Sequence, residues 1–204
     1  MADPFARLVD ALARDSAASS DFDLNPGTVL PEGRLLRPAG VMVGLMPAGD
    51  DLRVILTRRA AHLKHHPGQI AFPGGKQDGH DRDVIDAALR EAEEEISLPR
   101  RNVEVLGTLP THETVTGFQV TPVVTRIKAP FDPRPDQGEV AEVFHVPLAH
   151  VTDPARYLVQ SRIWAGSRRN YFAVPWGPYY IWGATARILR GLADRMQVRD
   201  EDRG

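Results

Sequence analysis

Three glutamates near the middle of the chain, Glu91, Glu94 and Glu95, have the type and spacing that metal-dependent chemistry requires. Spacings of three and four residues place side chains on one patch of a helix, where each like-charge pair costs about 0.2–0.5 kcal/mol. Because local stability opposes this arrangement, we expect a compensating cation, and carboxylate oxygens suit Mg²⁺ or Mn²⁺. A solvated acidic helix face is the alternative interpretation.

A glycine pair before the cluster favours the metal interpretation. Residues 72–75 read Phe-Pro-Gly-Gly, and Gly74 and Gly75 can adopt backbone conformations that other residues resist. Their bare amides can then approach a metal-bound diphosphate closely. We therefore predict that the glutamates hold a metal and that the two glycines offer backbone groups to the metal or its phosphate ligand.

A helix over residues 84–98 must position the glutamates. Asp83 is its candidate N-cap, Asp86 suits the first turn, and Pro99 prevents continuation. The apolar residues that recur at helical spacing are Val84, Ile85, Ala88, Leu89, Ala92 and Ile96.

A basic stretch precedes the glycine pair, between residues 56 and 72. Its cations and histidines are Arg58, Arg59, His62, Lys64, His65 and His66. A solvated basic loop is one interpretation. The position before the expected metal site favours another, in which the cations bind an additional phosphate. Zinc is disfavoured, because the histidine spacing follows no familiar ligand pattern.

Candidate site residues also occur later in the chain. Glu139 and Glu142 are either further carboxylates for the metal site or surface charges. Residues 110–118, PTHETVTGF, form either a substrate-facing loop or a plain turn. The aromatic residues of the C-terminal third either stack on an adenine or pack in the core; they are Trp164, Tyr171, Phe172, Trp176, Tyr179, Tyr180 and Trp182.

The remaining pattern predicts one α/β layered domain with a mixed sheet between helices. Strands are expected at 40–46, 52–57, 103–109, 119–127 and 139–147, a hairpin at 156–164 and 170–174, and helices at 4–14 and 182–192. We divide the chain into an N-terminal helix and connector (residues 1–38), the main domain (residues 39–194) and a charged tail (residues 195–204), frayed at its end.

Composition narrows the class of protein. The 204 residues are 42% hydrophobic and 25% charged, with a net charge of −2 and no cysteine. No global positive field recruits nucleic acid, no thiol is available, and no apolar run approaches the ~18 residues of a membrane span. We expect a cytoplasmic protein that binds neither nucleic acid nor membrane.

The central stretch resembles the Nudix box, G-x5-E-x7-R-E-apolar-x-E-E-x-G-apolar. The matching residues are Gly75, Arg90, Glu91, Ala92, Glu94, Glu95 and Leu98. Asp81 stands where glutamate is usual, and eight residues, not seven, separate it from Arg90. Ser97 replaces the last glycine, so that either a left-handed cap costs roughly 1–2 kcal/mol or the helix ends another way.

The basic stretch is similar to the extended signature of the coenzyme A diphosphatase branch of Nudix hydrolases. Its matching residues are Leu56, Thr57, Arg58, Arg59, Leu63, His66 (or His65), Gly68, Gln69, Phe72, Pro73, Gly74 and Gly75. Ala60 stands where the branch often has serine, and residues 181–189 resemble the closing helix of the branch.

The resemblance implies an α/β/α sandwich and a metal-dependent hydrolase. It implies Mg²⁺ or Mn²⁺ on Glu91, Glu94 and Glu95, with Arg90 orienting a catalytic carboxylate. Cleavage of coenzyme A or a thioester would give 3′,5′-ADP and 4′-phosphopantetheine, acylated or not. The expected substrate-binding residues are Arg58, Arg59, Lys64, His66, Gln69, Gly74 and Gly75, and the cations of this group suit the 3′-phosphate.

Several alternatives stay open. One is a different Nudix substrate, such as ADP-ribose, NADH or a nucleoside triphosphate. Another is a catalytically silent nucleotide-binding module, although a pure binder has no need of the repulsive glutamates. An RNA-processing enzyme of this fold is disfavoured by the net charge. The general base, which includes Glu139 among its candidates, and the choice between monomer and homodimer are also open.

Overall fold

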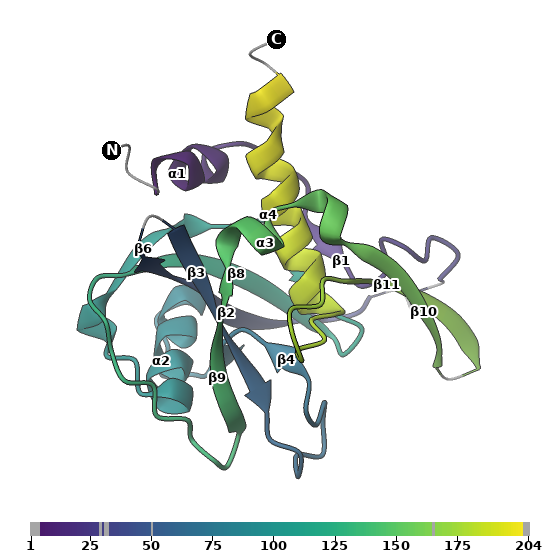
Figure 1. The fold of residues 1–204 in the computed structure, drawn as a ribbon. Helices are drawn as coiled ribbons and strands as arrows, with labels where there is room; N and C mark the ends of the chain where they lie inside the picture. The colour runs from purple at the N-terminus through teal and green to yellow at the C-terminus, as the bar shows by residue number, and fades with distance from the viewer. Residues whose placement is uncertain (1–4, 29, 31–32, 50, 165, 202–204) are drawn as a thin grey trace.

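The computed structural model describes residues 5–28, 30, 33–49, 51–164 and 166–201. Within these ranges, nine strands form the main sheet (Figure 1). They are β1 (Ser19–Ser20), β2 (Arg37–Ala48), β3 (Asp51–Arg59), β4 (Ile70–Ala71), β5 (Gly74–Lys76), β6 (Val103–Thr108), β7 (His112–Glu113), β8 (Phe118–Ile127) and β9 (Val140–Pro147). The five strands expected in the main domain are confirmed, with small shifts at their ends.

The sheet is mixed. Strand β2 pairs parallel with β8 and antiparallel with β3 and β5, and β3 pairs antiparallel with β9. Strands β2 and β3 form a hairpin, of which Asp50 lies outside the described residues. The parallel β2–β8 pair forms the centre of the sheet, and β5 brings the glycine pair alongside β2.

Helices cover both faces of the sheet, as Figure 1 shows for α2 (Val84–Ile96) and α4 (Ala184–Glu201). Because successive strand residues point to opposite faces, Met42 packs in a core cluster with α2, whereas Val43 packs in the cluster that contains α4. This arrangement is the α/β/α sandwich that the sequence predicts. No described helix has the length and apolar character needed to cross a membrane.

Four short helices complete the fold: α1 (Ala6–Leu12), α3 (Leu148–Val151) and the 3₁₀ turns η1 (Arg100–Asn102) and η2 (Pro154–Arg156). The expected N-terminal helix is shorter than residues 4–14, and Pro4 lies outside the described residues. The expected C-terminal hairpin is confirmed as β10 (Leu158–Trp164) and β11 (Ser167–Ala173), with Ala165 of its turn outside the described residues.

The expected C-terminal tail needs a correction. Helix α4 continues to Glu201, and its Arg195 is buried instead of starting a loose segment. The guanidinium of Arg195 donates to backbone oxygens at the end of α1, which fixes this part of the helix. Residues 202–204 of the expected tail and residues 1–4 at the other end lie outside the described residues.

Candidate active site

Capping residues define both ends of helix α2. Asp83 accepts a hydrogen bond from the backbone N–H of Asp86 at 2.8 Å and is the predicted N-cap. Hydrogen bonds from Arg82, and then Arg100, lower the pKa of Asp86 to about 2. At the other end, Ser97 adopts φ 57°, so of the two helix endings expected, the left-handed cap is the one that occurs.

Arg90 links three carboxylates. Its Nε and Nη2 donate to the two oxygens of Asp81 at 2.9 and 3.1 Å. Its Nη1 donates to Glu91 Oε1 at 3.0 Å and to Glu94 Oε2 at 2.8 Å. The side chain of Asp81 is only 2% exposed, so this loop aspartate anchors the guanidinium, which in turn orients the two glutamates.

Glu95 points from α2 toward the glycine pair. Its Oε2 accepts a hydrogen bond from the backbone N–H of Gly74 at 3.2 Å. Burial raises the pKa of Glu95 to about 8, and the negative charges of Glu91 and Glu139 act in the same direction. Burial also raises the pKa of Glu91. The surroundings therefore do not fully compensate the charged forms of Glu91 and Glu95.

Other parts of the chain approach Gly74 and Gly75 closely and leave little room for a side chain. A Cβ on Gly75 would lie 2.5 Å from Glu91 Oε1. A Cβ on Gly74, whose φ is 150°, would lie 2.4 Å from the backbone oxygen of Gly40. The absence of a Cβ on Gly74 therefore lets β5 lie against the backbone of β2, and its absence on Gly75 leaves room for the carboxylate of Glu91.

The chemistry of the donors fits a hard divalent cation, although the carboxylates do not converge on one point. Within the described ranges, no three Asp, Glu or His side chains are close enough together to hold a metal ion. Arg90 explains this, because it draws Glu91 and the largely exposed Glu94 to itself. Glu91, Glu94 and Glu95 offer only oxygen donors, and a bound cation would compensate the buried carboxylates of Glu91 and Glu95. Both properties match Mg²⁺ or Mn²⁺.

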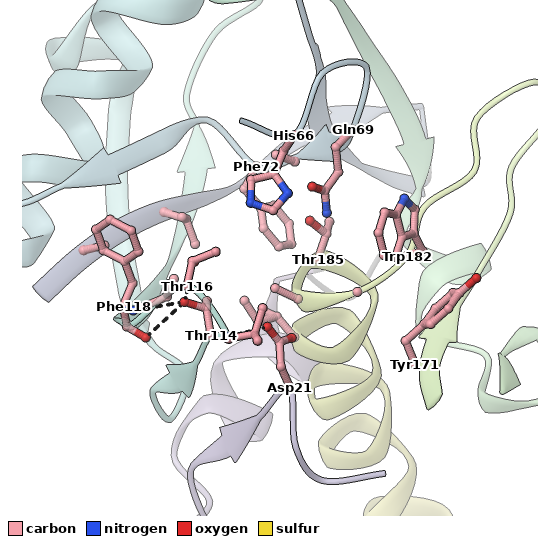
Figure 2. Close-up of a pocket in the computed structure, with 18 of the residues that line it drawn as sticks. Asp21, His66, Gln69, Phe72, Thr114, Thr116, Phe118, Tyr171, Trp182 and Thr185 are labelled. Atoms are coloured by element: carbon pink, nitrogen blue, oxygen red, sulfur yellow. Dashed lines mark hydrogen bonds between the residues drawn. The ribbon is translucent and has the colours of Figure 1, made fainter. Parts of the chain in front are cut away.

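A cavity of about 330 Å³ lies beside the glycine pair (Figure 2). Figure 2 shows Trp182 and Tyr171 on one side of it and Thr114, Thr116 and Phe118 on the other. Part of the segment 110–118 therefore faces a cavity: residues 114–117 form the turn between β7 and β8, and Thr114, Val115, Thr116 and Phe118 line the cavity. Asp21, which also lines the cavity, fixes this loop by accepting from Val115 N–H at 2.8 Å.

Most of the substrate-binding residues expected from the sequence lie together in this cavity. Five of them line it: Arg59, His66, Gln69, Gly74 and Gly75. Lys64 lines an adjoining cavity of about 430 Å³ that shares His66 and Gln69 with the first. Burial, together with the positive charge of Arg59, lowers the pKa of His66.

Arg58 needs a correction. It forms an ion pair with Glu142 at 2.9 Å, across the β3–β9 pair, and does not line the cavity. The register of β3 shifts between Arg58 and Arg59, and only Arg59 lines the cavity. Glu142 also accepts from Tyr179 Oη at 2.6 Å, so it serves this network and not the carboxylate cluster.

Glu139 lies within electrostatic reach of the cluster, since its charge helps to raise the pKa of both Glu91 and Glu95. Its backbone oxygen accepts from Ala60 N–H at 2.8 Å, which ties it to the start of the basic loop. The side chain of Glu139 is exposed. Of the two later carboxylates considered from the sequence, Glu139 is the one that the fold brings toward α2.

The aromatic residues of the C-terminal third divide into two groups. Tyr179 stacks on Phe144 with 3.6 Å between ring centroids, and Trp176 packs against His150, so these two rings belong to the interior. Phe172 also packs against the core and Tyr180 is exposed, whereas the second group lines the cavity: Trp164, Tyr171 and Trp182. Arg162 and Arg169 line it as well, and our sequence argument did not single them out.

Comparison with known proteins agrees with this geometry. The family model for the NUDIX domain matches residues 37–164. Relatives named "Uncharacterized Nudix hydrolase NudL", from Salmonella paratyphi B (strain ATCC BAA-1250 / SPB7) and Salmonella newport (strain SL254), are each 44% identical over 146 residues. These alignments cover 72% of this chain and 76% of each relative.

Solved structures show the same fold. The NUDIX domain of Shewanella oneidensis NrtR, whose structure contains ADP ribose, is 16% identical with a TM-score of 0.51, covering 84% of this chain and 96% of that chain. A MutT/nudix family protein from Enterococcus faecalis is 18% identical with a TM-score of 0.51, covering 85% of this chain and 66% of that chain.

Proposed function

This chain belongs to the Nudix family of hydrolases, which act on pyrophosphate bonds, and on that basis we propose that it hydrolyses coenzyme A or its thioesters. Water would attack one phosphorus of the diphosphate and the P–O–P bond would break. The products would be 3′,5′-ADP and 4′-phosphopantetheine, or its acylated form, with release of a proton. One observation carries the proposal: residues of the extended signature line the cavity that adjoins the carboxylate cluster.

Hydrolases of this family generally require a divalent metal such as Mg²⁺ or Mn²⁺. Glu91, Glu94 and Glu95 would hold it in this chain. When bound, such an ion neutralises phosphate charge and lowers the pKa of a coordinated water.

The protein's own groups position the reactants. Arg90 holds Glu91 and Glu94 through one guanidinium that Asp81 anchors from the loop. Gly74 and Gly75 bring the backbone of β5 against the cluster, where bare amides suit a diphosphate. Arg59, which lines the cavity and lowers the pKa of Glu95 by its charge, would pair with the diphosphate.

A carboxylate is the proposed general base. Glu139 suits this role because it is exposed to water yet close enough to influence Glu91 and Glu95. Lys64, His66 and Gln69 would contact the remainder of the substrate from the basic loop. A cytoplasmic location stays a prediction of the sequence.

ADP-ribose and NADH are the alternative substrates, and the ADP ribose in the NrtR NUDIX domain makes the first of them worth testing. We would measure kcat/KM for coenzyme A, acetyl-coenzyme A, ADP-ribose and NADH with Mg²⁺ and with Mn²⁺. The proposal predicts that coenzyme A or its thioester is cleaved best and that Glu94→Gln lowers turnover strongly. Faster cleavage of ADP-ribose or NADH would overturn the substrate assignment. Tight binding without turnover of any compound would favour a silent binding module.

A further inference from the structure

The β10–β11 hairpin supplies a cationic and aromatic wall to the cavity. In its antiparallel register, Arg162 lies opposite Arg169. Because alternate residues share a face of the hairpin, Trp164 and Tyr171 lie on the same side as these two arginines. All four residues line the cavity, whereas Arg168, on the other face, does not. Figure 1 shows the hairpin extending from the body of the protein beside α4.

Indole rings hold Arg162 in place. Its guanidinium carbon lies 4.8 Å from the ring centroid of Trp182 and 5.2 Å from that of Trp164. Arg169 lies 5.5 Å from the centroid of Trp164. Contact through the face of a guanidinium leaves its N–H groups, which lie in the plane, free to donate. The rings therefore orient the two cations without consuming their hydrogen-bonding capacity.

These cations are not compensated by the protein. Among the described residues, neither Arg162 nor Arg169 has a carboxylate within 4.0 Å, whereas Arg187 and Arg190 on nearby α4 pair with Asp23 and Asp194. Trp164 is 39% exposed, so its contacts with Arg162 and Arg169 are not part of the hydrophobic core. Two oriented guanidinium groups beside an aromatic wall suit a phosphate monoester attached to a nucleoside.

We propose that Arg162 and Arg169 bind the 3′-phosphate of the substrate, with Trp182 and Tyr171 against its nucleoside. This assignment rests on the proposed function and deepens it. It moves the recognition of the 3′-phosphate from the basic loop to the hairpin, because Arg58 is already paired with Glu142, the charge of Arg59 acts on Glu95, and Lys64 lines only the adjoining cavity. The chain then has separate cationic groups for the diphosphate and for the 3′-phosphate.

The test compares coenzyme A with dephospho-coenzyme A, which lacks only the 3′-phosphate. We would measure kcat/KM for both with wild type, Arg162→Gln, Arg169→Gln and the double variant. Arg168→Gln is the matched control, since it removes the same charge from the other face of the same hairpin. We expect the wild-type preference for coenzyme A to fall roughly 10–100-fold in the double variant and to persist in the control.

A binding measurement separates this inference from the proposed function. We would titrate 3′,5′-ADP and 5′-AMP into each protein by calorimetry, and we expect only 3′,5′-ADP to lose affinity in the double variant. An unchanged preference in both assays would overturn the inference while leaving coenzyme A hydrolysis standing. Absence of coenzyme A hydrolysis by wild type would instead overturn the proposed function, and the two titrations would still decide whether the hairpin binds a 3′-phosphate.

Discussion

Arg90 connects the loop that carries Asp81 to helix α2 through a single planar group. Asp81 accepts hydrogen bonds from Nε and Nη2, and Glu91 and Glu94 both accept from Nη1. A lysine has no such fork and would serve only one or two of these oxygens. Asp81, which stands where glutamate is usual, thus still accepts two hydrogen bonds from Arg90.

We predict that Arg90→Gln lowers both stability and turnover, for separable reasons. Asp81 would be left buried without its partner, which we expect to reduce the free energy of unfolding by about 2–4 kcal/mol. Adding Asp81→Asn removes that buried charge, so most of the stability should return. Turnover should stay low in the double variant, because nothing then orients Glu91 and Glu94.

Urea unfolding and steady-state turnover of wild type, both single variants and the double variant would check this prediction. Recovery of turnover together with stability in the double variant would contradict it. Arg90 would in that case serve only to neutralise Asp81.

Helix α2 shows how far a sequence pattern specifies an element. The apolar period, the Asp83 cap and the stop before Pro99 predict the helix nearly to its ends. They do not decide how it terminates, because serine tolerates the left-handed region only when surrounding contacts impose it. Here Ser97 Oγ donates to the backbone oxygen of Arg134 at 3.1 Å, a contact from a distant loop.

We predict that Ser97→Gly stabilises the protein by about 0.5–1 kcal/mol. Glycine removes the strain of φ 57° at this cap, and loss of the exposed hydrogen bond to Arg134 offsets part of the gain. The midpoint of urea unfolding should therefore rise. Ser97→Ala is the matched control, because it loses the hydroxyl but keeps the strain, and it should be slightly less stable than wild type. Equal midpoints for both variants would contradict the explanation.

The hairpin shows what sequence reasoning missed and why. Arg162, Trp164 and Arg169 were visible as residues, and strand alternation places them on one face. Nothing in the spacing shows that this face meets Trp182 and the cavity, because that contact depends on how the hairpin is placed against α4. In the same way, the sequence spacing does not show that Arg58 pairs with Glu142 of the neighbouring strand β9.

At the scale of the whole molecule, the N-terminal segment and the end of α4 hold each other. Arg195 Nε donates to the backbone oxygen of Ala11 and Nη2 to that of Leu12, both at 3.0 Å. Its guanidinium also contacts Ser16 and the backbone of Arg14. Residues 5–20 lie before the residues that match the NUDIX domain and Arg195 lies after them, so this contact joins two segments that flank the matched range. The expected domain boundary at residues 38 and 39 stays a prediction.

We predict that Arg195→Met reduces the free energy of unfolding by about 2–3 kcal/mol. Methionine retains much of the side-chain volume but leaves several buried carbonyl groups of the N-terminal segment without a donor. Arg195 lies near the C-terminal end of α4, whereas the residues of α4 that line the cavity lie in its first turns, so kcat should change little in conditions where the variant is folded. Urea unfolding and turnover at 15 °C would measure both. A large loss of kcat with unchanged stability would contradict this structural role.

The central claim is that the carboxylate cluster hydrolyses the diphosphate of coenzyme A. The most direct measurement is mass spectrometry of the products formed from coenzyme A, with Mg²⁺ or Mn²⁺ in ¹⁸O-labelled water, by wild type and by Glu95→Gln. We predict 3′,5′-ADP and 4′-phosphopantetheine, one of which carries a single ¹⁸O, and at most a trace of either with the variant. Formation of dephospho-coenzyme A and phosphate, or equal product from the variant, would contradict the account.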